Sequence, residues 1–92
     1  MTSPEAKRLW RRAIKDYFGN TCIYCGKLYE QHELTLDHVH PRSRGGSDLA
    51  SNTVCAYQKC NQNKGSTDWK EFMRSHFEFN PIREQILASH IQ

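Results

Sequence analysis

The sequence has no long apolar run. Nothing in it approaches the roughly eighteen consecutive apolar residues of a membrane-spanning helix, and the N-terminus lacks the apolar core of a secretion signal. Only 37% of the 92 residues are apolar, and the mean hydropathy is −0.83. These absences argue against a membrane protein and against a secreted one, and we expect a protein of the reducing cytoplasm.

Internal repeats, low-complexity segments and linkers are also missing, so residues 1–92 are predicted to form a single domain. A domain this small buries a modest share of its surface, and the low apolar content implies a thin core. Such domains usually need disulfides, a metal or a partner for stability. The net charge of +3 is only a mild indication of an anionic partner.

Four cysteines stand in two pairs, Cys22-x2-Cys25 and Cys55-x4-Cys60. In a reducing compartment, such clusters more often bind metal than form disulfides. Four thiolates supply the tetrahedral set that zinc favours, and a site with four protein ligands is structural because no position is open for water. Cys55 is the least secure ligand, since x4 is wider than the usual knuckle. Reduced core cysteines, a redox Cys-x-x-Cys site without its βαβ context and an iron–sulfur cluster are the alternatives.

Helical periodicity predicts a helix over residues 4–18, which Ser3-Pro4 would begin and Gly19-Asn20 would end. We expect its apolar stripe to pack into the core rather than to stack on nucleic-acid bases. The stripe consists of Trp10, Ala13, Ile14, Tyr17 and Phe18.

Further along the chain, strands are predicted over 33–39 and 52–56, with a loop over 41–51 between them and a short helix near 59–64. Asp68 to Glu71 resembles a capping box, and Asn80-Pro81 is typical of another helix start, so flanking helices are expected within 67–89. The predicted fold class is therefore α+β: a two-stranded antiparallel hairpin followed by a helix, with helices on either side.

Asp37 and His38 would point to opposite faces of the first strand, because side chains alternate along a strand. Imidazole titrates close to physiological pH, so His38 at the strand end is suited to take a proton from water. Asp37 is better suited to bind metal, and Asn61 adds another hard oxygen of the kind that Mg²⁺ or Mn²⁺ prefers. Such an ion fits phosphodiester cleavage. Four basic residues could bind the phosphates: Arg42, Arg44, Lys59 and Lys64.

In combination, ordered blocks between Cys22 and Gly65 resemble the HNH endonucleases. The blocks are Cys22-x2-Cys25, Leu36-Asp37-His38-x2-Pro41-x-Ser43-x-Gly45-Gly46, Asn52-x-Val54 and Cys60-Asn61-x2-Lys64-Gly65. The resemblance implies a ββα-metal core over 22–65 that carries a zinc knuckle. It also implies His38 as the general base, Asp37 and Asn61 as ligands of the catalytic metal, and Asn52 as a brace of the loop between the strands.

One departure concerns the zinc knuckle. Many family members place a cysteine closer to Cys60, at the position where this chain has Tyr57. Residues 55 and 57 of a strand face the same side, so Cys55 could still reach the ion, and a site formed by Cys22, Cys25, Cys55 and Cys60 is the expectation. A three-thiolate or metal-free knuckle, with Cys55 in the core, is the alternative.

The expected function is that of a metal-dependent DNA endonuclease with Mg²⁺ or Mn²⁺ at the catalytic site and structural Zn²⁺. It would contact the DNA backbone, nick or cleave with weak sequence preference, act as a monomer or homodimer, and come from a phage, a mobile element or a restriction system. The alternative is a zinc-stabilised module that binds nucleic acid without cutting it. That alternative explains the cysteines but not the register of Asp37, His38, Asn52 and Asn61.

Overall fold

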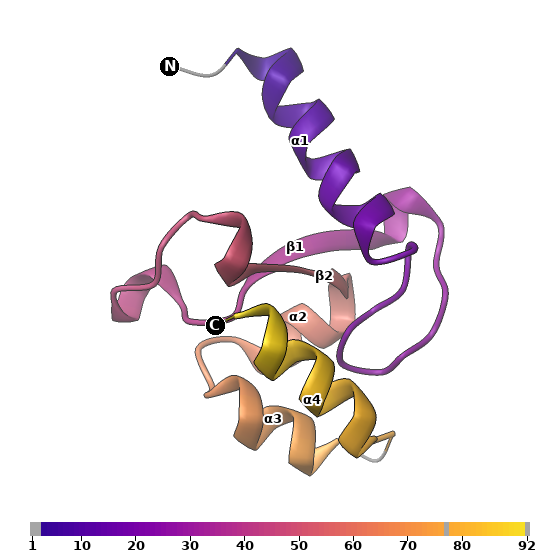
Figure 1. The fold of residues 1–92 in the computed structure, drawn as a ribbon, viewed down its shortest axis with the longest axis vertical. Coiled ribbons are helices and arrows are strands. Elements are labelled where there is room, and N and C mark those ends of the chain that lie inside the picture. The colour runs from indigo at the N-terminus through magenta and orange to yellow at the C-terminus, as the bar shows by residue number, and fades with distance from the viewer. Residues whose placement is uncertain (1–2, 77, 92) are drawn as a thin grey trace.

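The computed structural model describes residues 3–76 and 78–91, and its fold is shown in Figure 1. A small two-stranded sheet lies at the centre, with helices on both sides of it. In chain order the elements are α1 (Pro4–Tyr17), β1 (Leu34–His38), β2 (Thr53–Tyr57), α2 (Gln58–Lys64), α3 (Trp69–Ser75) and α4 (Pro81–His90), with short 3-10 turns at Gln31–Glu33, Arg42–Arg44 and Ala50–Asn52. The predicted α+β class, a hairpin followed by a helix and flanked by further helices, is confirmed.

The hairpin is antiparallel and pairs Leu34 with Tyr57 at one end and His38 with Thr53 at the other. Both strands differ from their predicted bounds by one residue at each end. Glu33 belongs instead to a 3-10 turn, because its side chain accepts a hydrogen bond from the backbone N–H of Glu30 at 3.3 Å. The register places Asp37 opposite Val54 on the buried side of the hairpin.

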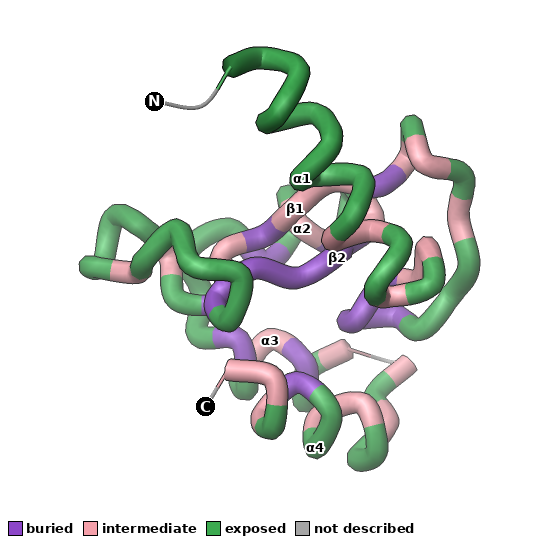
Figure 2. The backbone as a smooth tube through the Cα atoms, turned by 45° about the horizontal axis from the view of Figure 1, so that its top comes forward, coloured by how far each residue is buried: buried purple, intermediate pink, exposed green. Residues whose placement is uncertain are grey.

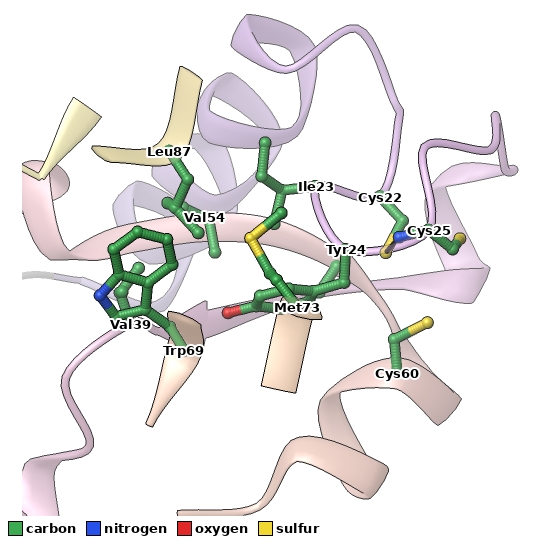
Figure 3. Packing of buried hydrophobic residues seen from close by; sticks show 11 residues of the cluster. Cys22, Ile23, Tyr24, Cys25, Val39, Val54, Cys60, Trp69, Met73 and Leu87 are labelled. Carbon is green, nitrogen blue, oxygen red and sulfur yellow. Dashed lines mark hydrogen bonds between the residues drawn. The ribbon is translucent and has the colours of Figure 1, made fainter. Parts of the chain in front are cut away.

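The core fills the space between the hairpin and the two C-terminal helices (Figure 3). Val39 and Val54 contribute the hairpin's apolar side chains, and Ile23 enters from the loop before β1. Three residues of α3 and α4 complete this part of the core: Trp69, Met73 and Leu87. Burial of each such side chain contributes about 1.5–3 kcal/mol, so this thin core is close to the minimum for a stable domain.

Helix α1 does not behave as its apolar stripe predicts. None of its residues is buried, and Trp10 and Tyr17 are 40% and 75% exposed. Figures 1 and 2 show the reason: the helix crosses the hairpin at one end and extends beyond it. A helix of 14 residues is about 21 Å long, whereas two five-residue strands offer a surface only about 17 Å long and two strands wide. The prediction that the stripe packs into the core is therefore wrong for Trp10 and Tyr17, while Phe18 does pack against the core.

The C-terminal region forms two short helices. The Asp68 carboxylate accepts the Glu71 N–H at 3.3 Å and begins α3, as the capping-box pattern predicts. Asn80 caps α4 by accepting the Ile82 N–H at 2.8 Å. Within the part of the chain that the structure describes, no helix is both long and apolar enough to cross a membrane.

Candidate active site and metal centre

Three cysteines converge at one end of the core. The sulfurs of Cys22, Cys25 and Cys60 all lie within 4.8 Å of one another, and all three residues are buried. Cys22 and Cys25 come from the turn before β1, and Cys60 comes from α2 (Figure 3). The Cys22 sulfur accepts the backbone N–H of Cys25 at 3.5 Å, but burial outweighs such bonds and raises the pKa of its thiol. The convergence of the three sulfurs makes this group a candidate zinc site.

Cys55 lies outside this group. It is fully buried in the middle of β2, opposite Leu36, and its carbonyl accepts the Ile23 N–H at 3.0 Å. Burial raises the pKa of its thiol to about 11, which favours the neutral form. The geometry therefore differs from the expected four-cysteine site, because the knuckle brings three thiols together and leaves the fourth in the core.

Two tyrosines cover the cysteine cluster. The Tyr29 hydroxyl lies 3.3 Å from the Cys25 sulfur, and its ring stacks on Tyr57 with centroids 4.1 Å apart and planes 6° from parallel. Burial raises the pKa of Cys25, but hydrogen bonds, the largest from Tyr29, outweigh that effect and leave the pKa lowered. Tyr57, at the position where the family resemblance predicted a cysteine, thus packs beside the cluster through its ring, which stacks on Tyr29.

Asp37 points toward α2 and is 6% exposed. Its Oδ2 atom accepts a hydrogen bond from the Tyr24 hydroxyl and lies 3.2 Å from the Lys64 ammonium. Burial, followed by the Asp37 charge, raises the pKa of Tyr24 well above its usual value, so Tyr24 stays a neutral donor. A buried carboxylate with these two partners is fully compensated.

Lys64 is 1% exposed, and its ammonium lies 3.4 Å from the His38 carbonyl as well as close to Asp37. The structure therefore places Lys64, a predicted phosphate ligand, inside the protein beside Asp37, and its contact with phosphate stays a prediction. Asn61, one turn earlier on α2, donates to the Leu36 carbonyl at 3.5 Å. Four oxygen-bearing groups thus lie where β1 meets α2: the side chains of Asp37 and Asn61 and the carbonyls of Leu36 and His38.

The His38 side chain occupies the opposite face of the hairpin. It lines an open cleft of about 1070 Å³ between α1 and β1, together with Trp10, Thr53 and several charged residues. The charged residues of the cleft are Lys7, Arg11, Lys15, Arg42 and Asp48. His38 Nε2 lies 2.9 Å from the Asp48 Oδ1 atom, and Arg42 Nε lies 3.5 Å from the same oxygen. The imidazole is therefore about one-third exposed, at the floor of a basic cleft.

Among the other predicted phosphate ligands, Arg44 and Lys59 are exposed, on the loop after β1 and on α2 respectively. Asn52 is 6% exposed, and its amide holds three backbone groups. It accepts the His40 N–H at 2.9 Å and donates to the carbonyls of His40, at 3.1 Å, and Ser47, at 2.8 Å. These bonds tie both ends of the loop between the strands to the start of β2.

Sequence reasoning missed two residues of this region. Tyr24 carried no signal, because a tyrosine inside a cysteine knuckle is typical of core packing. Asp48 had one: it is the only acidic residue of the sequence between Asp37 and Asp68, in a segment rich in arginine and lysine. An isolated carboxylate among cations is a candidate partner for a nearby imidazole.

Comparisons with known proteins identify the family and the fold. A family model described as HNH endonuclease matches residues 22–78. A protein of Bacillus subtilis (strain 168), "SPbeta prophage-derived putative HNH endonuclease YoqL", is 31% identical over 75 aligned residues, which cover 72% of this chain and 32% of that protein. The chain thus spans about a third of the length of this curated relative. Part of the type II-C Cas9 enzyme from Actinomyces naeslundii matches with a TM-score of 0.60 at 20% identity, over 89% of this chain and 11% of the enzyme, which shows likeness of fold.

Proposed function

Because the chain belongs to the HNH endonuclease family, we propose that it hydrolyses phosphodiester bonds of DNA with the help of a divalent metal ion. The observation that carries the proposal is the position of His38. His38 is the last residue of β1, and its partly buried imidazole lies at the floor of an open, basic cleft. The residue before it, Asp37, is a buried carboxylate. A cleft of this charge attracts a polyanion, and an imidazole there can take a proton from an attacking water.

Asp37 on β1 and Asn61 on α2 are the residues that would hold the catalytic ion. Asp37 and Asn61 offer a carboxylate and an amide oxygen, the donors that Mg²⁺ and Mn²⁺ prefer. The Lys64 ammonium lies 3.2 Å from Asp37 Oδ2 and 3.4 Å from the His38 carbonyl, so these oxygens already bind a cation, which supports the proposal. An ion held by Asp37 and Asn61 would supply Lewis-acid stabilisation of a phosphate oxygen.

The thiol cluster fits a structural zinc ion. Zn–S bonds of about 2.3 Å place tetrahedral ligands about 3.8 Å apart, a spacing that the three sulfurs can adopt with little movement. Cys22, Cys25 and Cys60 would hold the ion, and the Tyr29 hydroxyl lies 3.3 Å from the Cys25 sulfur. Their burial separates this site from the cleft, so its role is to join the turn before β1 to α2.

DNA would lie across the cleft face with its backbone against α1 and the loop after β1. The exposed side chains of Arg11, Arg42 and Arg44 can bind phosphates there. Phosphate contacts set affinity and position but do not read sequence, so weak sequence preference and nicking by a monomer are the expected behaviour. A homodimer would cut both strands.

A zinc-stabilised module that binds nucleic acid without cutting it is the second candidate, and the exposed basic face of α1 favours it. A plasmid-nicking assay with Mg²⁺, Mn²⁺ or EDTA, repeated on supercoiled, linear and single-stranded DNA, separates the two. We expect nicks that require the ion and disappear with EDTA. Binding without cleavage under every metal would contradict the endonuclease and favour the module.

A further inference from the structure

The His38 side chain makes a polar contact with Asp48. The Asp48 Oδ1 atom lies 2.9 Å from His38 Nε2, a good hydrogen-bond length, although the two residues are ten positions apart and on different elements. We infer that Asp48 is a positioning residue for His38: it holds the proton on Nε2 and leaves the Nδ1 lone pair as the base. This inference rests on the proposed function and adds a residue to that machinery.

The loop that carries Asp48 is built to hold it in place. Its neighbours on both sides have their carbonyls bound by residues at the start of β2: Ser47 by the Asn52 amide at 2.8 Å and Leu49 by the Thr53 hydroxyl at 2.9 Å. Asn52 and Thr53 are both buried, at 6% and 1% exposure. The Asp48 side chain is 64% exposed, but hydrogen bonds to buried residues hold the backbone on both sides of it.

Gly46 adds a second constraint on the same loop. Its N–H donates to the Pro41 carbonyl at 3.0 Å, and an added Cβ atom would lie 1.6 Å from the His40 carbonyl oxygen. Such a separation is impossible for any residue with a side chain, so glycine is needed for this close approach. The loop is consequently pressed against the end of β1, directly after His38.

The charge of Asp48 decides which imidazole nitrogen carries the proton. An ionised carboxylate can only accept a hydrogen bond, so the nitrogen that faces it must be the donor. Arg42 Nε lies 3.5 Å from the same oxygen, and Lys7, Arg11 and Lys15 also line the cleft. Because Nε2 donates to Asp48, Nδ1 is left to accept the proton of the attacking water, and the carboxylate stabilises the imidazolium that results.

The test combines a spectroscopic signature with kinetics. Nitrogen-15 NMR of the histidine ring in the full chain, without DNA and at a pH where imidazole is neutral, reports which nitrogen is protonated. We expect the Nε2–H tautomer of His38 in the wild type and a mixture in Asp48→Ala. We also expect kcat for plasmid nicking to fall about ten- to a hundredfold in that variant, as for loss of a hydrogen bond to a charged group. KM should not rise, since removing an acid from a DNA-binding cleft does not weaken phosphate binding.

Two further variants sharpen the result. Asp48→Asn keeps an accepting oxygen but loses the charge, so it should keep the tautomer and cut at a rate between the wild type and Asp48→Ala. Asp16→Asn, a matched change at an exposed aspartate of α1 that contacts Gln31, should alter neither readout. An Nδ1–H tautomer in the wild type, or an Asp48→Ala protein with wild-type tautomer and kcat, would overturn the inference. If the wild type itself does not cut, the proposed function fails, while the tautomer of the DNA-free chain still decides the role of Asp48.

Discussion

The two ends of this small domain treat their reactive side chains in opposite ways. At the cysteine cluster, Cys22, Cys25 and Cys60 are all at most 7% exposed and are covered by aromatic rings. In the cleft between α1 and β1, the side chains of His38 and Asp48 are 33% and 64% exposed and lie among lysine and arginine side chains. Buried thiols suit an ion that holds the chain together, because substrate does not reach them, whereas an exposed imidazole suits chemistry on a ligand that must arrive and leave.

The hairpin connects the two regions. Asp37 faces α2 and the buried side, while His38, the next residue, faces the cleft, so adjacent residues serve opposite surfaces. Alternation along a strand produces this division without any additional element. The comparison therefore predicts that changes on the cysteine side alter folding, and that changes on the cleft side alter binding and cleavage.

Loss of the structural ion should have the largest effect. In a domain with so thin a core, zinc binding is part of the folding free energy, so Cys60→Ala or a strong chelator should abolish the cooperative thermal transition. Cys55→Ala is the matched control, because Cys55 lies outside the group of three sulfurs. It should keep one zinc ion per chain by metal analysis and lose only the stability of one small core side chain. Equal loss of zinc in Cys60→Ala and Cys55→Ala would mean that Cys55 is also a zinc ligand.

Breaking the buried pair between Asp37 and Lys64 should have the next largest effect. Their side chains are 7% and 0% exposed, and removal of one partner leaves an uncompensated charge inside the protein. We expect Lys64→Met to lower the free energy of unfolding by about 3–5 kcal/mol, measured by urea denaturation. Lys59→Met, on the exposed face of the same helix, should change it by less than about 0.5 kcal/mol. Similar values for the two variants would mean that Lys64 is not part of the interior.

A smaller effect is expected from the basic wall of the cleft. Arg11→Ala should weaken DNA binding, and the slope of log K against log salt should fall by about 0.9 if one phosphate contact is lost. Thermal stability should not change, because α1 has no buried residue. Lys70→Ala, on α3 at the opposite side of the hairpin (Figure 1), is the control and should leave the slope unaltered. An unchanged slope in Arg11→Ala would remove α1 from the DNA-binding face.

Local patterns predicted most of the architecture. Alternation and turn residues placed both strands to within one residue at each end, and the capping signals of Asp68 and Asn80 correctly marked two helix starts. These features depend on neighbours in the sequence, so the sequence alone carries them. The convergence of Cys22, Cys25 and Cys60 also followed from spacing, since a tight turn brings the first two together and α2 brings the third.

The features that the sequence did not predict depend on tertiary structure. The apolar stripe of α1 is real, but whether it is buried depends on how much surface the hairpin offers, which no periodicity reveals. Lys64 reads as a basic residue after a motif, yet Asp37 and Tyr24 create a buried site for its charge. Asp48 reads as a loop acid, and its contact with His38 depends on how Asn52 and Thr53 hold the loop.

The most direct test of the account is the rate of plasmid nicking by His38→Ala in the zinc-loaded, folded protein. Loss of a general base should lower the rate by about 10²–10⁴-fold with Mg²⁺ or Mn²⁺, while zinc content and thermal midpoint stay at wild-type values. His32→Ala, at an exposed histidine in the 3-10 turn before β1, is the matched control and should cut like the wild type. A His38→Ala protein that nicks DNA at the wild-type rate would contradict the assignment of chemistry to the cleft.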